Sequence, residues 1–188
     1  MTASTPAPTP TDSTDAAFSD LLKRSIRDVP DFPESGIMFR DISTLLADPH
    51  LFRQTVDAMA APFSDIDKVV IIESRGFILG TPIAYAIGAG VVPVRKPGRL
   101  PAATYSENYT LEYGTNSLEV HQDAILAGER VLIVDDLLAT GGTVNATVRL
   151  VERMQGEIVG ISVLAELSAL KGRDTIRPGI TVHSLVVY

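Results

Sequence analysis

Apolar residues at helical spacing open the first patterned part of the chain. Phe18, Leu21, Leu22 and Ile26 share one face of a helix. Pro30 ends this run, because proline can neither donate a main-chain hydrogen bond nor continue a helix. The pattern therefore predicts a first helix from about residue 16 to residue 26.

A second amphipathic stripe begins after Asp48 and Pro49. Asp is a favoured N-cap residue and Pro fits the first helical position, so the pair predicts a helix start. A third helix is expected over residues 76–87, closed by Gly88. The apolar residues of the second helix are Phe52, Val56, Met59, Ala60 and Phe63, and a fourth helix places Val144, Val148 and Val151 on one face.

Short continuous runs of Val, Ile and Leu predict strands between these helices. Such runs are typical of parallel strands, which are buried on both faces. Polar, Pro-rich and Gly-rich residues 95–108 predict a long loop. A hairpin of 109–113 and 117–120 over residues 114–116 is expected after it. The expected buried strands are 69–72, 91–94, 131–134, 158–164 and 180–187.

The alternation of buried strands with amphipathic helices predicts an α/β fold with a mainly parallel central sheet flanked by helices. In such sheets, ligands bind beyond the carboxyl ends of the strands. Three segments follow strand ends and are expected to face one cleft: residues 73–76, the loop from residue 95, and residues 135–143.

Length and composition limit the organisation and the class of protein. The chain has 188 residues, which at about 100–200 residues per domain predicts one domain. Residues 1–15 carry almost no large apolar side chain and predict a disordered tail before a domain over 16–188. The net charge of −7 argues against nucleic acid and membrane surfaces as partners, because both need positive fields.

The absence of cysteine excludes disulfides, thiol catalysis and thiolate zinc sites. The histidines are scattered at positions 50, 121 and 183, which disfavours a histidine metal site. No apolar run reaches the roughly 20 residues that span a bilayer, and residues 1–17 lack the features of a signal peptide. We therefore expect a cytoplasmic protein.

The stretch VLIVDDLLATGGT, residues 131–143, carries the strongest chemical signal. A buried strand delivers Asp135 and Asp136 to its exit, and small residues then open a helix whose main-chain N–H groups suit an anion. An ordinary strand-to-helix turn with a Thr cap is the alternative interpretation. The stretch lacks the Lys of a P-loop and the pattern of a dinucleotide fingerprint.

Residues 131–143 resemble the phosphoribosyl-diphosphate (PRPP) motif of the type I phosphoribosyltransferases. Further landmarks in the same order resemble the adenine branch of that family, and together they span residues 29–188. These landmarks are VPDFP at 29–33, GIMFRDI at 36–42, ESRGF at 73–77, RKPGRLP at 95–101, LEYG at 111–114 and LKGR at 170–173.

The resemblance implies the type I phosphoribosyltransferase fold with a mobile flap over the active site. It implies transfer of a 5-phosphoribosyl group from PRPP to adenine, giving AMP and diphosphate. A homodimer and Mg²⁺ bound mainly through PRPP, with no direct protein ligand, are also implied. Transfer to xanthine or guanine, or a non-catalytic PRPP-sensing regulator, are alternatives that the landmarks and the negative charge disfavour.

The resemblance also implies a role for each candidate residue. Glu112 is expected to be the catalytic acid/base, and Asp135 and Asp136 to lie at the ribose hydroxyls. Glu73 stands where the family usually has Asp, and Pro97 where it often has a basic residue. The 5′-phosphate residues are expected to be Ala139, Thr140, Gly141, Gly142 and Thr143, the diphosphate residues Arg75, Lys96 and Arg99, and the adenine residues Met38, Phe39 and Leu137.

Overall fold

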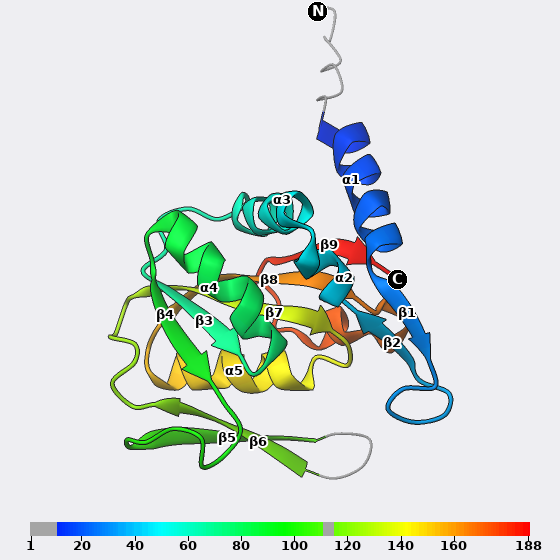
Figure 1. Ribbon diagram of the computed structural model, residues 1–188. Helices are drawn as coiled ribbons and strands as arrows, with labels where there is room; N and C mark the ends of the chain where they lie inside the picture. The colour runs from blue at the N-terminus through cyan, green and yellow to red at the C-terminus, as the bar shows by residue number, and fades with distance from the viewer. Residues whose placement is uncertain (1–10, 111–114) are drawn as a thin grey trace, which may run out of the picture. The chain divides into compact units, whose positions relative to one another are not determined.

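The computed structural model describes residues 11–110 and 115–188 (Figure 1). The chain divides into two compact units, Met1–Phe52 and Arg53–Tyr188. The assignment of one domain to residues 16–188 stays a prediction.

The first unit consists of a helix, a small hairpin and a short helix. Helix α1 (Thr11–Ser25) begins within the segment predicted as a tail and confirms the first expected helix. Strands β1 (Arg27–Pro30) and β2 (Met38–Asp41) pair antiparallel, and α2 (Ser43–Ala47) follows. Apolar side chains of α1 and α2, Leu22 and Leu45, are fully buried. The hairpin escaped prediction because its strands are short and contain no fully buried residue.

Helix α3 (Pro49–Ala60) begins where the sequence predicted. The Asp48 carboxylate accepts hydrogen bonds from the main-chain N–H groups of His50 at 2.9 Å and Leu51 at 3.0 Å. The bond from Leu51 is the main reason that the pKa of Asp48 lies below its usual value. Asp48 is therefore the N-cap of α3, and Pro49 occupies the first helical position.

A five-stranded parallel sheet forms the centre of the second unit. Its strand order is β4-β3-β7-β8-β9, and every neighbouring pair runs parallel. The expected mainly parallel α/β fold is confirmed. The strands are β3 (Lys68–Ile72), β4 (Gly90–Val94), β7 (Arg130–Leu138), β8 (Glu157–Glu166) and β9 (Val182–Val187).

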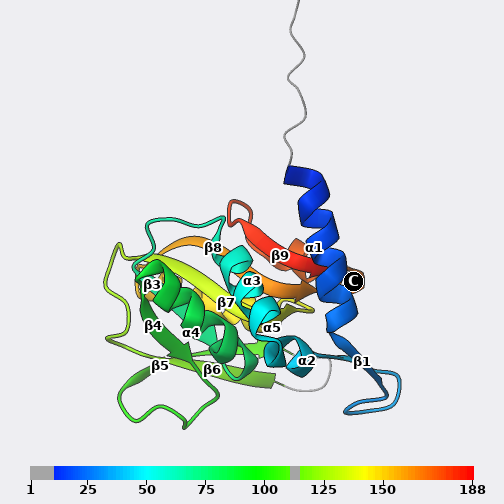
Figure 2. The same cartoon turned by 45° about the horizontal axis from the view of Figure 1, so that its top comes forward.

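Helices α4 (Arg75–Ile87) and α5 (Gly142–Arg153) cover opposite faces of this sheet (Figures 1 and 2). Alternate residues of β3 and β7 face α4 or α5, because successive strand side chains point to opposite sides. Gly80 of α4 lies so close to β3 that a Cβ there would be 2.2 Å from Ile71 Cγ2. Val70 and Ile133 belong to the core cluster that includes the buried residues of α5.

A two-stranded hairpin of β5 (Thr104–Thr110) and β6 (Thr115–His121) packs along α5. The predicted hairpin exists, but its boundaries were wrong: β5 starts inside the predicted loop, and Thr115 and Asn116 belong to β6 rather than to the turn. The error arises because polar residues interrupt β5, so that only Tyr105 and Tyr109 signal its packed face.

Strand β7 is longer than predicted. Its pairing with β8 continues beyond Val134 to Leu138, which lies opposite Glu166. Asp135 and Asp136 therefore lie within the strand rather than past its end. Pairing of β7 with β3 stops at Val134, so Asp135 and Asp136 are the first two residues of β7 beyond that pairing.

Two short 3₁₀ helices, η1 (Ser168–Leu170) and η2 (Gly172–Thr175), connect β8 with β9. Within the described residues, no helix combines the length and the apolar character needed to cross a membrane.

Candidate functional site

The turn from β7 into α5 forms an open pocket of about 240 Å³. Gly141, at the N-cap of α5, has a φ of 84°, a conformation that disfavours residues with a Cβ. All five predicted 5′-phosphate residues and Leu137 line this one pocket. The lining is the continuous segment Leu137, Leu138, Ala139, Thr140, Gly141, Gly142, Thr143 and Val144.

This pocket has the chemistry of an anion site. The first N–H groups of a helix have no carbonyl partner within that helix, and its dipole places partial positive charge at that end. Gly142 and Thr143 are the first two residues of α5, so their N–H groups are of this kind. The Thr140 and Thr143 hydroxyls add possible donors. A phosphate group fits this combination of donors and positive potential.

The end of the turn rests on η2. A Cβ on Gly172 would lie 2.1 Å from the carbonyl oxygen of Ala139, and a Cβ on Gly141 would lie 2.3 Å from Thr175 Oγ1. The Thr175 hydroxyl accepts a hydrogen bond from Asn145 Nδ2 at 2.8 Å and donates one to the Gly172 carbonyl at 2.7 Å. The sequence analysis did not single out Thr175, whose contacts depend on the tertiary fold.

Asp135 and Asp136 are both buried, with exposed fractions of 8% and 7%. Burial raises the pKa of each, and for Asp135 the neighbouring Asp136 raises the pKa further. Arg75 Nε lies 2.9 Å from Asp136 Oδ2 and opposes the effect of burial on that carboxyl. Asp135 Oδ1 accepts a hydrogen bond from the Asp136 N–H at 2.9 Å. The structure thus brings together a predicted diphosphate residue and the predicted ribose residues.

Glu73 joins the end of β3 to the loop that follows β4. Its carboxylate accepts hydrogen bonds from Arg95 Nη2 at 3.0 Å and from the Lys96 N–H at 3.0 Å. The bond with Arg95 is the main cause that lowers the pKa of Glu73. Glu119 of β6 accepts a further bond from the Gly98 N–H at 3.0 Å. Two carboxylates therefore hold the start of the basic loop in place.

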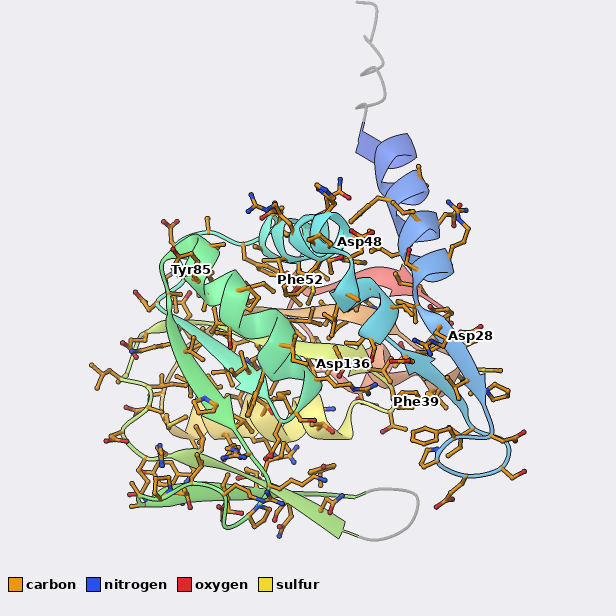
Figure 3. The ribbon with its side chains drawn as sticks, viewed as in Figure 1. Asp28, Phe39, Asp48, Phe52, Tyr85 and Asp136 are labelled. Atoms are coloured by element: carbon orange, nitrogen blue, oxygen red, sulfur yellow. The ribbon has the colours of Figure 1, made fainter. Side chains whose placement is uncertain are left out.

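The three predicted segments do meet at the carboxyl ends of the strands. Glu73 contacts Arg95, and Arg75 contacts Asp136, so residues 73–76, the loop from residue 95 and residues 135–143 are neighbours. The side chains of Lys96 and Arg99 are exposed. In Figure 3, Asp136 is drawn beside the end of α4 where Arg75 begins the helix.

The predicted adenine residues Met38 and Phe39 lie on β2 of the first unit. Met38 is exposed, while Phe39 is half-buried and packs edge-to-face against Phe32 with ring centroids 5.0 Å apart. Arg40 forms an ion pair with Asp28 on the opposite strand β1. Figure 3 labels Asp28 and Phe39 in this hairpin.

Glu112 lies outside the described residues, between β5 and β6 in the sequence. In the part of the chain that the structure describes, no three His, Cys, Asp or Glu side chains lie together as a metal site. Asp135 and Asp136 are two adjacent oxygen donors, which suits an ion that takes its remaining ligands from water and phosphate.

Comparisons with known proteins agree with this geometry. The family "Phosphoribosyl transferase domain" matches residues 43–181. An adenine phosphoribosyltransferase of Myxococcus xanthus is 57% identical over 169 residues, which cover 89% of this chain and 90% of that protein. The one of Geobacter metallireducens is 56% identical over 171 residues, covering 90% and 99%.

Solved structures give the same result. The crystal structure of adenine phosphoribosyltransferase from Rhodothermus marinus has a TM-score of 0.89 at 52% identity, covering 92% of this chain and 99% of that one. The enzyme of Saccharomyces cerevisiae, solved with an imino-altritol bisphosphate and adenine, has a TM-score of 0.85 at 39% identity, covering 90% and 99%. The chain belongs to the adenine phosphoribosyltransferase family.

Proposed function

We propose that this protein transfers the 5-phosphoribosyl group of PRPP to adenine and releases AMP and diphosphate. The observation that carries the proposal is the pocket formed by Leu137–Val144, directly after the buried Asp135–Asp136 pair. This arrangement combines an anion site with carboxylates that suit sugar hydroxyls. Purine salvage is the physiological role that follows from such a reaction.

The 5′-phosphate is proposed to bind the main-chain N–H groups of Ala139–Thr143. Asp135 and Asp136 are proposed to bind the ribose, directly or through water. Positive charge develops on the sugar in an oxocarbenium-like transition state, as in glycosyl transfer generally. Carboxylates near the ribose lower the energy of that charge, because preorganised groups of opposite sign stabilise developing charge.

The leaving diphosphate needs cations, and we propose that Arg75, Lys96 and Arg99 supply them. Arg75 offers a planar guanidinium, which suits bidentate contacts with phosphate oxygens. Lys96 and Arg99 are exposed on the loop whose start Glu73 and Glu119 hold. We propose that this loop belongs to a mobile flap that closes over the diphosphate.

Met38, Phe39 and Leu137 are proposed to contact adenine. A polar contact with the exocyclic amine would discriminate against 6-oxopurines, because a buried donor or acceptor left unpaired costs about 1–3 kcal/mol. The family resemblance of residues 36–42 supports this assignment to the adenine base.

Glu112 is proposed to exchange a proton with N7 of the purine as N9 attacks the ribose. A carboxyl group serves in this role if flap closure removes water and raises its pKa. Glu112→Gln should lower kcat by about 10²–10⁴-fold, the usual contribution of general acid–base catalysis, while PRPP binding persists. Unchanged kcat would reject the assignment.

Mg²⁺ fits the donors present, since it binds through one or two carboxylates plus substrate phosphates and keeps several waters. Asp135 and Asp136 would hold it, mainly through water. When bound, the ion neutralises charge on the diphosphate. Excess EDTA should stop AMP formation and added Mg²⁺ should restore it; full activity in EDTA would contradict this proposal.

A homodimer is also proposed, supported by exposed apolar side chains along α4 and the start of β4. Tyr85 is 90% exposed and points away from the sheet (Figure 3), and Ile78 and Val91 are 47% and 43% exposed. Tyr85→Glu should shift sedimentation toward monomer, whereas a monomeric wild type would reject the dimer. The cytoplasmic location stays a prediction from composition.

The reaction is tested by supplying PRPP with adenine, hypoxanthine, guanine or xanthine in separate assays. AMP and diphosphate should form in equal amounts with adenine alone. A preference for a 6-oxopurine, or no product with any base, would overturn the proposed function.

A further inference from the structure

We propose that η2, and above all the Thr175 hydroxyl, is a positioning element that sets the conformation of the 5′-phosphate turn without binding the phosphate. The proposal rests on the proposed function, because it assumes that the pocket of Leu137–Val144 receives a phosphate. Thr175 and Gly172 do not line that pocket, yet both touch the backbone that forms it.

The backbone of η2 lies in steric contact with the phosphate turn. The missing Cβ of Gly172 would fall 2.1 Å from the Ala139 carbonyl oxygen and 2.9 Å from the Gly141 nitrogen. From the other side, a Cβ on Gly141 would fall 2.8 Å from the Gly172 carbonyl. The two glycines therefore permit backbone-to-backbone packing that any other residue would push apart. The phosphate turn rests directly on η2.

Hydrogen bonds of Thr175 also connect η2 with α5. Thr175 Oγ1 joins η2 to α5, since it accepts from Asn145 Nδ2 and donates to the Gly172 carbonyl. Asn145 also donates its main-chain N–H to the Gly141 carbonyl at 2.9 Å, which forms the first turn of α5. One hydroxyl thus links the support to the helix end that presents the N–H groups.

Arg173 fixes η2 to strands β8 and β9. The Arg173 guanidinium forms an ion pair with Glu166 and donates to the Val182 carbonyl at 2.8 Å and to Ser184 Oγ at 2.9 Å. Glu166 is only 6% exposed, and Ser184 Oγ donates to it at 2.9 Å. The Arg173 bond lowers the pKa of this carboxyl. Glu166 also pairs with Leu138, which lines the phosphate pocket.

Together these contacts hold η2 from two strands on one side and against the phosphate turn on the other. Donors that are already in place bind an anion more tightly than donors that must first be ordered. Loosening η2 should therefore weaken binding of the phosphoribosyl group and leave adenine binding almost unchanged. A residue that only supports the fold would not produce that split.

The test compares Thr175→Val, which keeps the shape and removes the hydroxyl, with Thr175→Ser, which keeps the hydroxyl. Binding of ribose 5-phosphate is measured by calorimetry, and KM is measured for PRPP and for adenine. Thr175→Val should weaken both phosphoribosyl ligands roughly three- to tenfold, as expected for one lost hydrogen bond. Thr175→Ser should restore wild-type values. Thr181→Val is the matched control, because Thr181 is exposed and directly precedes the first residue of β9.

Gly172→Ala is the second variant, because its Cβ meets the Ala139 carbonyl and not a ligand. It should raise the PRPP KM at least as much as Thr175→Val. If Thr175→Val alone weakens binding, the hydroxyl contacts phosphate directly and the positioning role is overturned. If neither variant changes ribose 5-phosphate binding while the wild type forms AMP, the inference fails and the proposed function stands. If the wild type binds ribose 5-phosphate with the predicted variant effects but forms no AMP, the proposed function fails alone.

Discussion

Replacing Arg75 by Gln removes the cation that faces the buried Asp135–Asp136 pair. Arg75 Nε lies 2.9 Å from Asp136 Oδ2, and the Asp136 side chain is only 9% exposed against 33% for Arg75. Burial already raises the pKa of Asp136, and Arg75 is the main group that opposes this rise. The variant should therefore raise the pKa of Asp136 further and destabilise its ionised form.

The magnitude follows from the charges and their exposure. Two unit charges about 4 Å apart interact by about 4 kcal/mol at an effective dielectric constant near 20. Breaking a buried ion pair costs about 3–5 kcal/mol, and solvent around the partly exposed Arg75 reduces this. We expect a loss of about 2–3 kcal/mol in the free energy of unfolding at pH 8. The pKa of Asp136 should rise further above its usual value, because the neighbouring cation that favours its ionised form is lost.

The contribution of Asp136 to the free energy of unfolding should decrease as pH rises. A carboxyl with a raised folded pKa keeps its proton in the folded state after the unfolded chain has lost it, so stability falls as pH rises through that window. The window begins near the unfolded pKa of about 3.9 and ends at the folded pKa, which Arg75→Gln moves upward. The deficit of the variant should be small near pH 4, grow with pH, and level off above the raised pKa.

Urea unfolding at fixed protein concentration from pH 4 to pH 8 measures this deficit. The control is the double variant Arg75→Gln/Asp136→Asn, in which no unpaired charge is buried at position 136. Its stability should recover and should depend on pH less than that of the single variant. A deficit that is equal at pH 4 and pH 8, or that persists undiminished in the double variant, would refute the reasoning.

Two further predictions concern other contacts of the second unit. Glu73→Gln should raise the PRPP KM, because Arg95 and the Lys96 N–H lose a charged acceptor. Since the pKa of Glu73 is lowered, the stability that its carboxylate contributes should be present at neutral pH and vanish as pH falls through that pKa. Unfolding curves of the wild type and the variant at pH 7 and pH 3 check this. Gly80→Ala places a Cβ against Ile71 and should cost about 1–3 kcal/mol, lowering Tm; an unchanged Tm would contradict the close packing.

Much of the second unit was predictable because its central strands β3 and β7 are buried on both faces. Runs such as those at 69–72 and 131–134 are apolar throughout, and a parallel sheet covered by helices on both faces buries such strands fully. The phosphate pocket was predictable for a related reason: all its lining residues are consecutive, so local sequence contains the whole pocket.

Features that depend on neighbours distant in sequence were not predictable. The length of β7 beyond Val134 is set by pairing with β8, and the acids in this stretch look like the end of a strand. Strand β5 reaches α5 through Glu107, which forms an ion pair with Arg149, and through Tyr105, which lies under Arg153. Polar strand residues of this kind carry little hydrophobic signal.

The same distinction applies to the support of the site. The sequence around residues 170–173 was recognisable as a landmark, but its contact with the phosphate turn was not, since Gly172 and Ala139 meet only in the folded chain. The contacts of Glu73 and Glu119 with the basic loop were not predictable either, because Glu73 follows β3 and Glu119 lies on β6, far from it in sequence.

The eight consecutive residues of the phosphate pocket lie in one compact unit, whereas the β1–β2 hairpin with Phe39 lies in the other. The residues proposed to contact adenine therefore come from two distant stretches of gene, since Leu137 lines the phosphate pocket while Met38 and Phe39 lie on β2. Mutagenesis libraries restricted to codons 38 and 39 would vary two of the three proposed adenine residues without changing any residue that lines the phosphate pocket.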